Sequence, residues 1–139
     1  MSHLAVRQAR SEELHRLAVS ALESLPPEIA SADSYQPRRT EQLLGADVVF
    51  VAELDGHPAG HVAVRQEADA MIVDQLVVDE ASQGVGVGNC LLDWVEGYAL
   101  SRGMPRVRIE VEDGNERAQD FYRRRGYVCG AGMAERSLP

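Results

Sequence analysis

Residues 71–92, MIVDQLVVDEASQGVGVGNCLL, predict a strand, a glycine-rich turn and a helix, in that order. The apolar run Met71–Val78 is typical of a buried strand and contains one charge, at Asp74. The turn Gln83–Gly88 then has glycine at three alternate positions, and helical spacing begins at its end. We expect the rest of the chain to be organised around this unit.

The turn between this strand and helix is suited to binding an anion through backbone groups. The first N–H groups of a helix have no acceptor inside the helix, and they carry partial positive charge. Glycine allows the backbone to approach a ligand closely, so that successive N–H groups can surround a phosphate. The segment Gln83–Gly88 is therefore a candidate phosphate-binding loop.

Two familiar nucleotide-binding motifs do not fit this loop. A P-loop requires GxxxxGK[ST], and no lysine follows these glycines. A dinucleotide-binding loop requires GxGxxG with an acidic residue about 20 residues further on, whereas residues 84–88 are GVGVG. The expected anion therefore belongs to a ligand other than a nucleoside triphosphate or NAD.

Length and composition indicate one globular domain. The 139 residues, 45% hydrophobic and 26% charged, are enough for one core, so we expect a single domain over residues 1–139. No apolar run approaches the length of a membrane span, and charges near the N-terminus argue against a signal peptide. Cys90 and Cys129 belong to no CxxC pair, and we expect reduced thiols in a cytoplasmic protein.

The net charge of −8 favours some partners over others. It argues against nucleic acid and favours a cationic or amine-bearing partner, although solubility alone also explains such a charge. All 14 basic side chains are arginine. Arginine suits bidentate phosphate contacts, and genomic base composition is the alternative explanation.

Hydrophobic periodicity predicts the element order β α α β β β α β α β. We expect strands over Leu4–Ala9, Val48–Leu54, Ala59–Gln66, Ala70–Val78, Arg106–Glu112 and Tyr127–Leu138, the last of them broken near Gly130 and Gly132. We expect helices over Ser11–Leu25, with Ser11 as N-cap, over Arg38–Leu44, over Val87–Arg102, and from Asn115 as N-cap to Gly126.

The connections decide how these strands pair. Short turns join the three strands between Val48 and Val78, which predicts an antiparallel meander. The helix Val87–Arg102 separates the third of these strands from the next, which predicts a right-handed parallel crossover. The fold class is therefore mixed α/β (α+β), with a mostly antiparallel twisted sheet and helices on both faces.

Two motifs occur in this order along the chain. The first, L-x-V followed by Q/R-x-x-G-x-G/A, is matched by Leu76–Val78 and then Gln83–Gly88. The second, V-x-x-x-N-x-x-A-x-x-F/L-Y-x-x-x-G-F/Y, is matched by Val111, Asn115, Ala118, Phe121, Tyr122, Gly126 and Tyr127. Together they resemble the GNAT superfamily, the acyl-CoA-dependent N-acetyltransferases, from about Val48 to Tyr127. The resemblance implies the acyl-CoA N-acyltransferase fold.

The resemblance implies how acetyl-CoA, the acyl donor, would be bound. The backbone of Leu76–Val78 would pair with the pantetheine arm where two parallel strands diverge, and the loop would hold the pyrophosphate. Asn115 would contact the cofactor arm. The implied cofactor-binding residues are Leu76, Val77, Val78, Gln83, Gly84, Val85, Gly86, Val87, Gly88, Asn115 and Tyr122.

The resemblance also implies catalytic residues for transfer of an acetyl group to a primary amine. Tyr122 would protonate the leaving thiolate. Glu110 is the candidate general base, because its spacing to Tyr122 resembles that in the ribosomal-protein alanine N-acetyltransferases; Asp74 or water is the alternative. A backbone N–H at Leu76 or Val77 would stabilise the oxyanion. No metal is expected, since the four histidines show no ligand spacing.

Some features leave alternatives open. Val85 stands where many relatives have a basic residue, so arginines from elsewhere, such as Arg123–Arg125, are candidate phosphate contacts, unless they stabilise the helix end. A complete final hairpin barely fits after Tyr127, so a second subunit could complete the sheet in a homodimer. The acceptor could be a small-molecule amine or a peptide N-terminus. The alternative function is a non-catalytic acyl-CoA-binding module.

Overall fold

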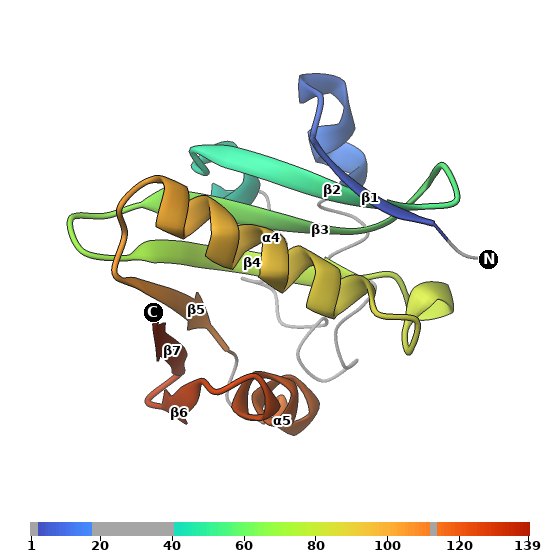
Figure 1. Ribbon diagram of the computed structural model, residues 1–139. Coiled ribbons are helices and arrows are strands. Elements are labelled where there is room, and N and C mark those ends of the chain that lie inside the picture. The colour runs from blue at the N-terminus through green and yellow to red at the C-terminus, as the bar shows by residue number, and fades with distance from the viewer. Residues whose placement is uncertain (1–2, 18–40, 112–113) are drawn as a thin grey trace.

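Seven strands form one sheet in the order β1-β2-β3-β4-β5-β7-β6 (Figure 1). The structure is a computed structural model, and it describes residues 3–17, 41–111 and 114–139. The strands are β1 (Leu4–Gln8), β2 (Val48–Leu54), β3 (His57–Gln66), β4 (Met71–Val78), β5 (Arg106–Glu110), β6 (Val128–Gly130) and β7 (Met133–Ser137). All adjacent pairs are antiparallel except β4–β5, so the predicted mixed, mostly antiparallel sheet is confirmed.

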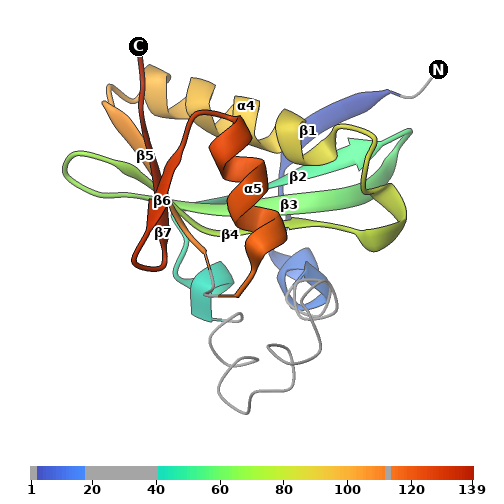
Figure 2. The same ribbon diagram turned by 90° about the horizontal axis from the view of Figure 1, so that it is seen from below.

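Helices cover both faces of this sheet. The α-helices are α4 (Val87–Ser101) and α5 (Glu116–Arg124), the 3₁₀ segments are η1 (Ser11–Glu13) and η2 (Glu80–Ser82), and residues 14–17 and 41–44 are also helical. In Figure 2, α4 lies on one side of the sheet, and η1 and residues 41–44 lie on the other. The remainder of the two predicted N-terminal helices lies outside the described residues.

The predicted antiparallel meander is confirmed in β2, β3 and β4. Leu54 pairs with His57 across a two-residue turn, Asp55-Gly56, in which both residues have positive φ, 53° and 86°. Such a turn matches the right-handed twist of two antiparallel strands. Strand β3 begins at His57 rather than at Ala59, because the turn is two residues shorter than predicted.

The core between the sheet and α4 is built on one apolar stripe of this helix. Five side chains of α4 are each at most 1% exposed: Val87, Leu91, Leu92, Val95 and Ala99. They pack against the strand residues whose side chains point to the same side, among them Val62, Val64 and Val73. A smaller cluster on the opposite face joins Val49, Val51 and Ala63 to Leu17 and Leu43.

The predicted break near Gly130 and Gly132 in the last strand is confirmed, and its two parts form a hairpin. The hairpin consists of β6 and β7, and β7 pairs with β5. Ala131 and Gly132 supply the positive φ values, 53° and 76°, that the turn between β6 and β7 requires. The expectation that a hairpin barely fits here is therefore wrong, and the reason given for a second subunit at this edge falls away.

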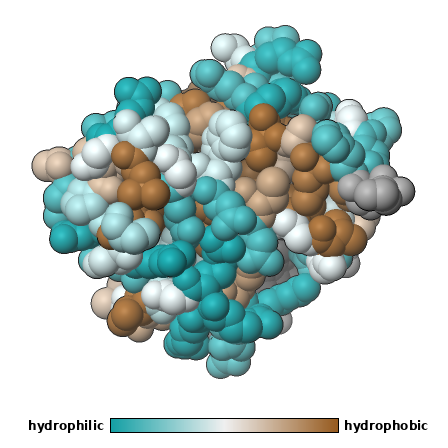
Figure 3. Space-filling model, viewed as in Figure 1, coloured by the Kyte–Doolittle hydropathy of each residue, from teal (hydrophilic) through white to brown (hydrophobic). Residues whose placement is uncertain are grey.

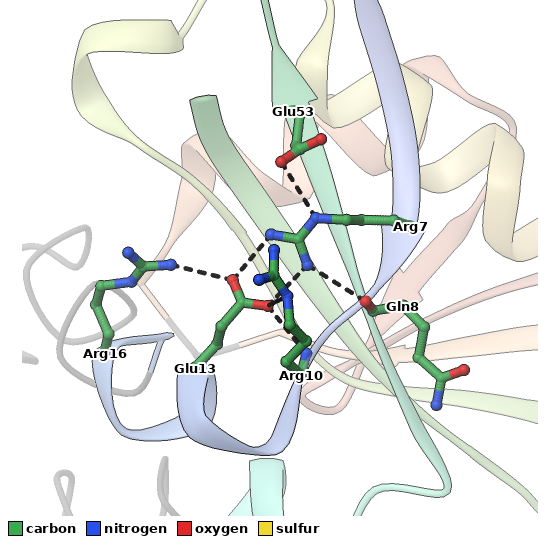
Figure 4. A network of polar contacts seen from close by, with 6 residues as sticks. All are labelled: Arg7, Gln8, Arg10, Glu13, Arg16 and Glu53. Carbon is green, nitrogen blue, oxygen red and sulfur yellow. Dashed lines mark hydrogen bonds and ion pairs between the residues drawn. The ribbon is translucent and has the colours of Figure 1, made fainter. Parts of the chain in front are cut away.

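A cluster of charges anchors the first helical turns to the sheet (Figure 4). The Arg7 guanidinium donates to both Glu13 carboxylate oxygens, at 2.7 and 2.9 Å, and its Nε lies 3.1 Å from Glu53. Arg16 donates to Glu13 at 3.0 Å. The predicted N-cap, Ser11, is wrong: the N-cap is Arg10, and its backbone N–H donates to Glu13.

The face that carries α4 is largely hydrophilic, with separate hydrophobic patches (Figure 3). The large apolar side chains exposed among the described residues are Leu44, Val85, Trp94, Leu100, Val128 and Met133. Scattered apolar surface of this kind is ordinary in globular proteins.

Candidate functional site

Strands β4 and β5 pair only along the first part of β4 and then diverge. Their parallel ladder has three residue pairs and ends at Val73 and Ile109. Beyond that point β5 turns away from β4 toward α5 (Figure 1). The segment Leu76–Val78 lies past the end of the ladder and still pairs with β3 along its other edge. Its edge toward β5 is thus the place where an extended ligand could add to the sheet.

A β-bulge changes the direction of side chains just at this point. Ala63 pairs with Gln75 and Val64 with Val73, so Asp74 is an extra residue in β4. Val73 and Leu76 both belong to the core beneath α4. Because side chains alternate along a strand, Asp74 and Gln75 must both point to the opposite face. No periodicity in the sequence signals this change.

The predicted phosphate-binding loop begins helix α4. Gly84 and Gly86 have φ values of +84° and +91°, which a residue with a side chain rarely adopts. The N–H of Cys90 donates to Gly86 O at 2.9 Å and closes the first helical turn. The N–H groups of the residues before Cys90 in this turn therefore precede the intrahelical hydrogen bonds and can serve an anion.

Helix α5 packs against this loop and carries Tyr122. A Cβ atom on Gly88 would lie 3.3 Å from the Phe121 ring, so α5 approaches the first turn of α4 closely. The Asn115 side chain accepts a hydrogen bond from the Ala118 N–H at 3.3 Å, and it caps α5 as predicted. Tyr122 is 5% exposed, and its ring centroid lies 5.9 Å from that of Tyr127.

An acidic pocket of about 260 Å³ opens on the face opposite α4. Its described lining residues are Glu41, Gln42, Gly45, Arg65, Asp74 and Glu110. Both candidate bases, Asp74 and Glu110, therefore line one pocket. Tyr122, by contrast, belongs to the core on the α4 side of the sheet. The point where β4 and β5 diverge lies between the pocket on one face of the sheet and Tyr122 on the other.

The two candidate bases have different partners. Arg65 Nε lies 2.6 Å from one oxygen of the buried Asp74 carboxylate, and a terminal nitrogen lies 3.2 Å from the other oxygen. These bonds, and a weaker contribution from Glu67, raise the pKa of Arg65. Glu110, at the exposed end of β5, accepts a hydrogen bond from the Gln42 side-chain amide at 3.2 Å.

The chain matches a known protein family. Residues 12–127 match the model of the Acetyltransferase (GNAT) family. The chain belongs to this family. A curated relative, an uncharacterized N-acetyltransferase of Methanocaldococcus jannaschii, is 31% identical over 88 residues; the match covers 58% of this chain and 39% of that protein. The chain therefore spans about two fifths of that relative's length.

Solved structures of the GNAT family share the fold. Ard1 from Thermoplasma volcanium has a TM-score of 0.77 at 19% identity, and the match covers 98% of each chain. The PaiA N-acetyltransferase from Thermoplasma acidophilum, in complex with coenzyme A, has a TM-score of 0.75 at 17% identity, covering 98% of this chain and 99% of that one. The predicted mixed α/β GNAT fold is therefore confirmed.

One group of residues suggested as phosphate contacts in this GNAT domain has other partners. Arg125 lies 2.6 Å from Asp93 and 3.0 Å from Glu96, and it donates to Asn89, all on α4. Arg123 pairs with Asp120, and Arg124 donates to the Asp120 carbonyl. The contacts of Arg123 and Arg124 support the alternative interpretation, in which the arginines stabilise the end of α5. Arg125 instead joins α5 to α4.

Several residues at the pocket were not singled out from the sequence. Gln42 contacts both Glu110 and Gln75, at 3.2 Å each, and the buried His61 contacts Gln75 at 2.6 Å. Polar residues inside two apolar strands were the available signal. Gly60 was also missed: a Cβ there would lie 2.6 Å from Val77 O, so glycine is needed where β3 pairs with Val77 and Val78 of β4.

Two further properties of the described residues bear on the site. Among residues 3–17, 41–111 and 114–139, no group of three or more His, Cys, Asp or Glu side chains could hold a metal ion. In that same part of the chain, no helix has the length and apolar character needed to cross a membrane.

Proposed function

We propose that this GNAT protein transfers an acetyl group from acetyl-CoA to a primary amine by direct attack in a ternary complex. One observation carries the proposal: β4 and β5 part between a glycine loop suited to phosphate and a carboxylate pocket. A thioester bound where the two strands diverge would have Glu110 on one face of the sheet and Tyr122 on the other. Such positioning supplies much of the rate of a two-substrate reaction.

The cofactor would follow the open edge of β4. The backbone of Leu76–Val78 pairs with the amides of the pantetheine arm, as a strand would. The N–H groups of the loop hold the pyrophosphate; the residues are Gln83, Gly84, Val85, Gly86, Val87 and Gly88. Asn115 contacts the arm through its side-chain NH₂, because its oxygen already caps α5.

Glu110 acts as the general base. An amine attacks only when neutral, so a group beside it must accept its proton. Both oxygens of Asp74 are bonded by Arg65, which makes that carboxylate a poorer acceptor than Glu110. Glu110 stands just beyond the last β4–β5 pair, where the carbonyl of the thioester would lie.

The remaining steps use the backbone and Tyr122. Successive N–H groups of a strand point to opposite edges, so one of the N–H groups of Leu76 and Val77 points away from β3 and can stabilise the oxyanion. The tetrahedral intermediate then breaks its carbon–sulfur bond. Tyr122 donates its phenolic proton to the departing thiolate, and the products are the acetylated amine and CoA.

The pocket favours a cationic acceptor. Three carboxylates, those of Glu41, Asp74 and Glu110, face one arginine, Arg65. A peptide N-terminus or a small amine with a second positive charge would be attracted by this surplus of negative charge. The protein as a whole, at −8, adds to the attraction.

A thiol-release assay tests the proposed function. Purified protein is mixed with acetyl-CoA and, in separate wells, 1,4-diaminobutane, kanamycin and a peptide with N-terminal alanine. We expect free CoA to appear with at least one amine, and mass spectrometry to find an added acetyl group on that amine. Binding of acetyl-CoA without transfer to any amine would instead favour the non-catalytic acyl-CoA-binding module.

A further inference from the structure

A line of side-chain hydrogen bonds leads to Glu110 from a buried site on the face of the sheet opposite α4. His61 Nε2 lies 2.6 Å from Gln75 Oε1, and Gln75 Nε2 donates to Gln42 Oε1 at 3.2 Å. Gln42 Nε2 then donates to Glu110 Oε2, also at 3.2 Å. The four residues come from β3, β4, the helical residues 41–44 and β5, so four separate segments converge on one carboxylate.

The direction of this line is determined by its end. An ionised carboxylate can only accept, so Gln42 must present its NH₂ to Glu110 and its oxygen to Gln75. Gln75 must then turn its NH₂ toward Gln42 and its oxygen toward His61. His61 must therefore carry a proton on Nε2. Every N–H in the line points toward Glu110.

The buried end of the line lies where apolar residues would be expected. His61 and Gln75 are 1% and 2% exposed, and His61 pairs across the sheet with Val51 of the smaller apolar cluster. Burying polar side chains costs free energy that hydrogen bonds only offset, and apolar residues of similar shape can serve as well. The stability of the fold therefore does not require these residue types.

We propose that His61, Gln75 and Gln42 are positioning residues for Glu110. The proposal rests on the proposed function, in which Glu110 is the base. The hydrogen bond from Gln42 to Glu110 Oε2 restricts rotation of the carboxylate about its Cγ–Cδ bond. A carboxylate held in one orientation meets the amine in the same geometry at every turnover, which raises kcat rather than affinity.

The first test needs no substrate. Long-range proton–nitrogen NMR of the full-length, ¹⁵N-labelled protein reports which ring nitrogen of each histidine carries hydrogen. His61→Gln identifies the signals of His61 among those of the four histidines. We expect the Nε2–H form for His61. The Nδ1–H form would make Nε2 an acceptor, reverse the line and overturn the proposal.

The second test uses Gln75→Met, which changes a residue linked to Glu110 through Gln42 and keeps a similar volume in the buried site. With acetyl-CoA and the fastest amine of the panel, we expect kcat to fall on the order of tenfold. The KM for acetyl-CoA should stay within twofold. Gln42→Met, at a half-buried position, should lower kcat at least as much. Gln8→Met, the same change on the exposed part of β1, is the control and should leave kcat unchanged.

Combining variants separates a positioning role from a structural one. If the line acts through Glu110, adding Gln75→Met to Glu110→Gln should lower kcat no further. Equal losses in both backgrounds, or wild-type kcat in Gln75→Met, would overturn the proposal. If Glu110→Gln itself leaves kcat and the pH–rate profile unchanged, the role of Glu110 in the proposed function fails, and the positioning proposal fails with it.

Discussion

Asp74 and Glu110 line one pocket from neighbouring strands, and Arg65 contacts both carboxylate oxygens of Asp74. Because Arg65 occupies the Asp74 carboxylate, the same acid-to-amide substitution should affect catalysis more at Glu110 than at Asp74. Glu110→Gln should lower kcat by about 10²–10⁴-fold and remove the acid limb of the pH–rate profile. Asp74→Asn should keep that limb and mainly lower stability. An unchanged profile in Glu110→Gln would transfer the role of base to Asp74 or to water.

Tyr122→Phe removes the hydroxyl group of the proposed general acid and keeps the aromatic ring. We expect kcat to fall by about 10²-fold, with much less change in acetyl-CoA affinity, because only the leaving thiolate needs the proton. Steady-state kinetics and calorimetric binding of acetyl-CoA measure the two effects. If both fall together, or neither changes, the role assigned to Tyr122 is wrong.

Tyr127→Phe is the matched control for that experiment. The Tyr127 hydroxyl donates to Glu96 at 2.7 Å, and burial, with this hydrogen bond, raises the pKa of the phenol. Losing the bond should cost about 2 kcal/mol of stability, as for other hydrogen bonds to charged groups. The kcat should stay close to that of the wild type, since the bond joins α4 to the residue before β6.

Substitution by alanine should change stability in opposite directions at Gly86, the N-cap of α4, and at Gly97, inside α4. Gly86, the N-cap of α4, has a φ of +91°, so Gly86→Ala should cost about 1–2 kcal/mol and weaken CoA binding. Gly97 lies inside α4, and apart from its chain neighbours and the backbone of the helix itself no atom lies within 4 Å of an added Cβ. Gly97→Ala should therefore raise stability by about 0.5–1 kcal/mol and leave CoA binding unchanged. Denaturant unfolding and calorimetry measure both; weakened CoA binding in both variants would contradict the role of the loop.

Glu13 should make stability depend on pH in the acidic range. The Arg7 guanidinium, followed by the Arg10 N–H, lowers the pKa of Glu13 from 4.5 to about 2. A lowered folded-state pKa contributes stability that is complete above 4.5 and is lost as the pH falls toward 2. Wild type should thus be more stable than Glu13→Gln at pH 6, and the difference should shrink between pH 4.5 and 2. A difference that is independent of pH would contradict this account.

Local patterns predicted much of the fold. The spacing of Val87, Leu91 and Val95 gave the buried stripe of α4, and Asn115 was recognised as the cap of α5 because its residue type and position suit that role. The glycine loop was found because backbone requirements appear directly as glycines. These features depend on residues close together in the chain, and local sequence reports them well.

Long-range contacts around the pocket were less predictable. Gln42 bonds to Glu110 across 68 positions and to Gln75 across 33, and neither glutamine has a pattern that announces its partner. The bulge at Asp74 turns two successive side chains to one face, which a period of two cannot reveal. The final hairpin was underestimated because its turn uses Ala131 at positive φ, where glycine or asparagine is usual.

The most direct test of the account is a thermal-shift comparison of acetyl-CoA, CoA, ATP and NAD with the purified protein. A ligand that binds only the folded state, at 100 times its Kd, adds about 2.7 kcal/mol to stability and raises the unfolding midpoint. We predict a rise with both CoA compounds and little change with ATP or NAD. No rise with either CoA compound would contradict the account, because the glycine loop would then be a structural turn without a phosphate ligand.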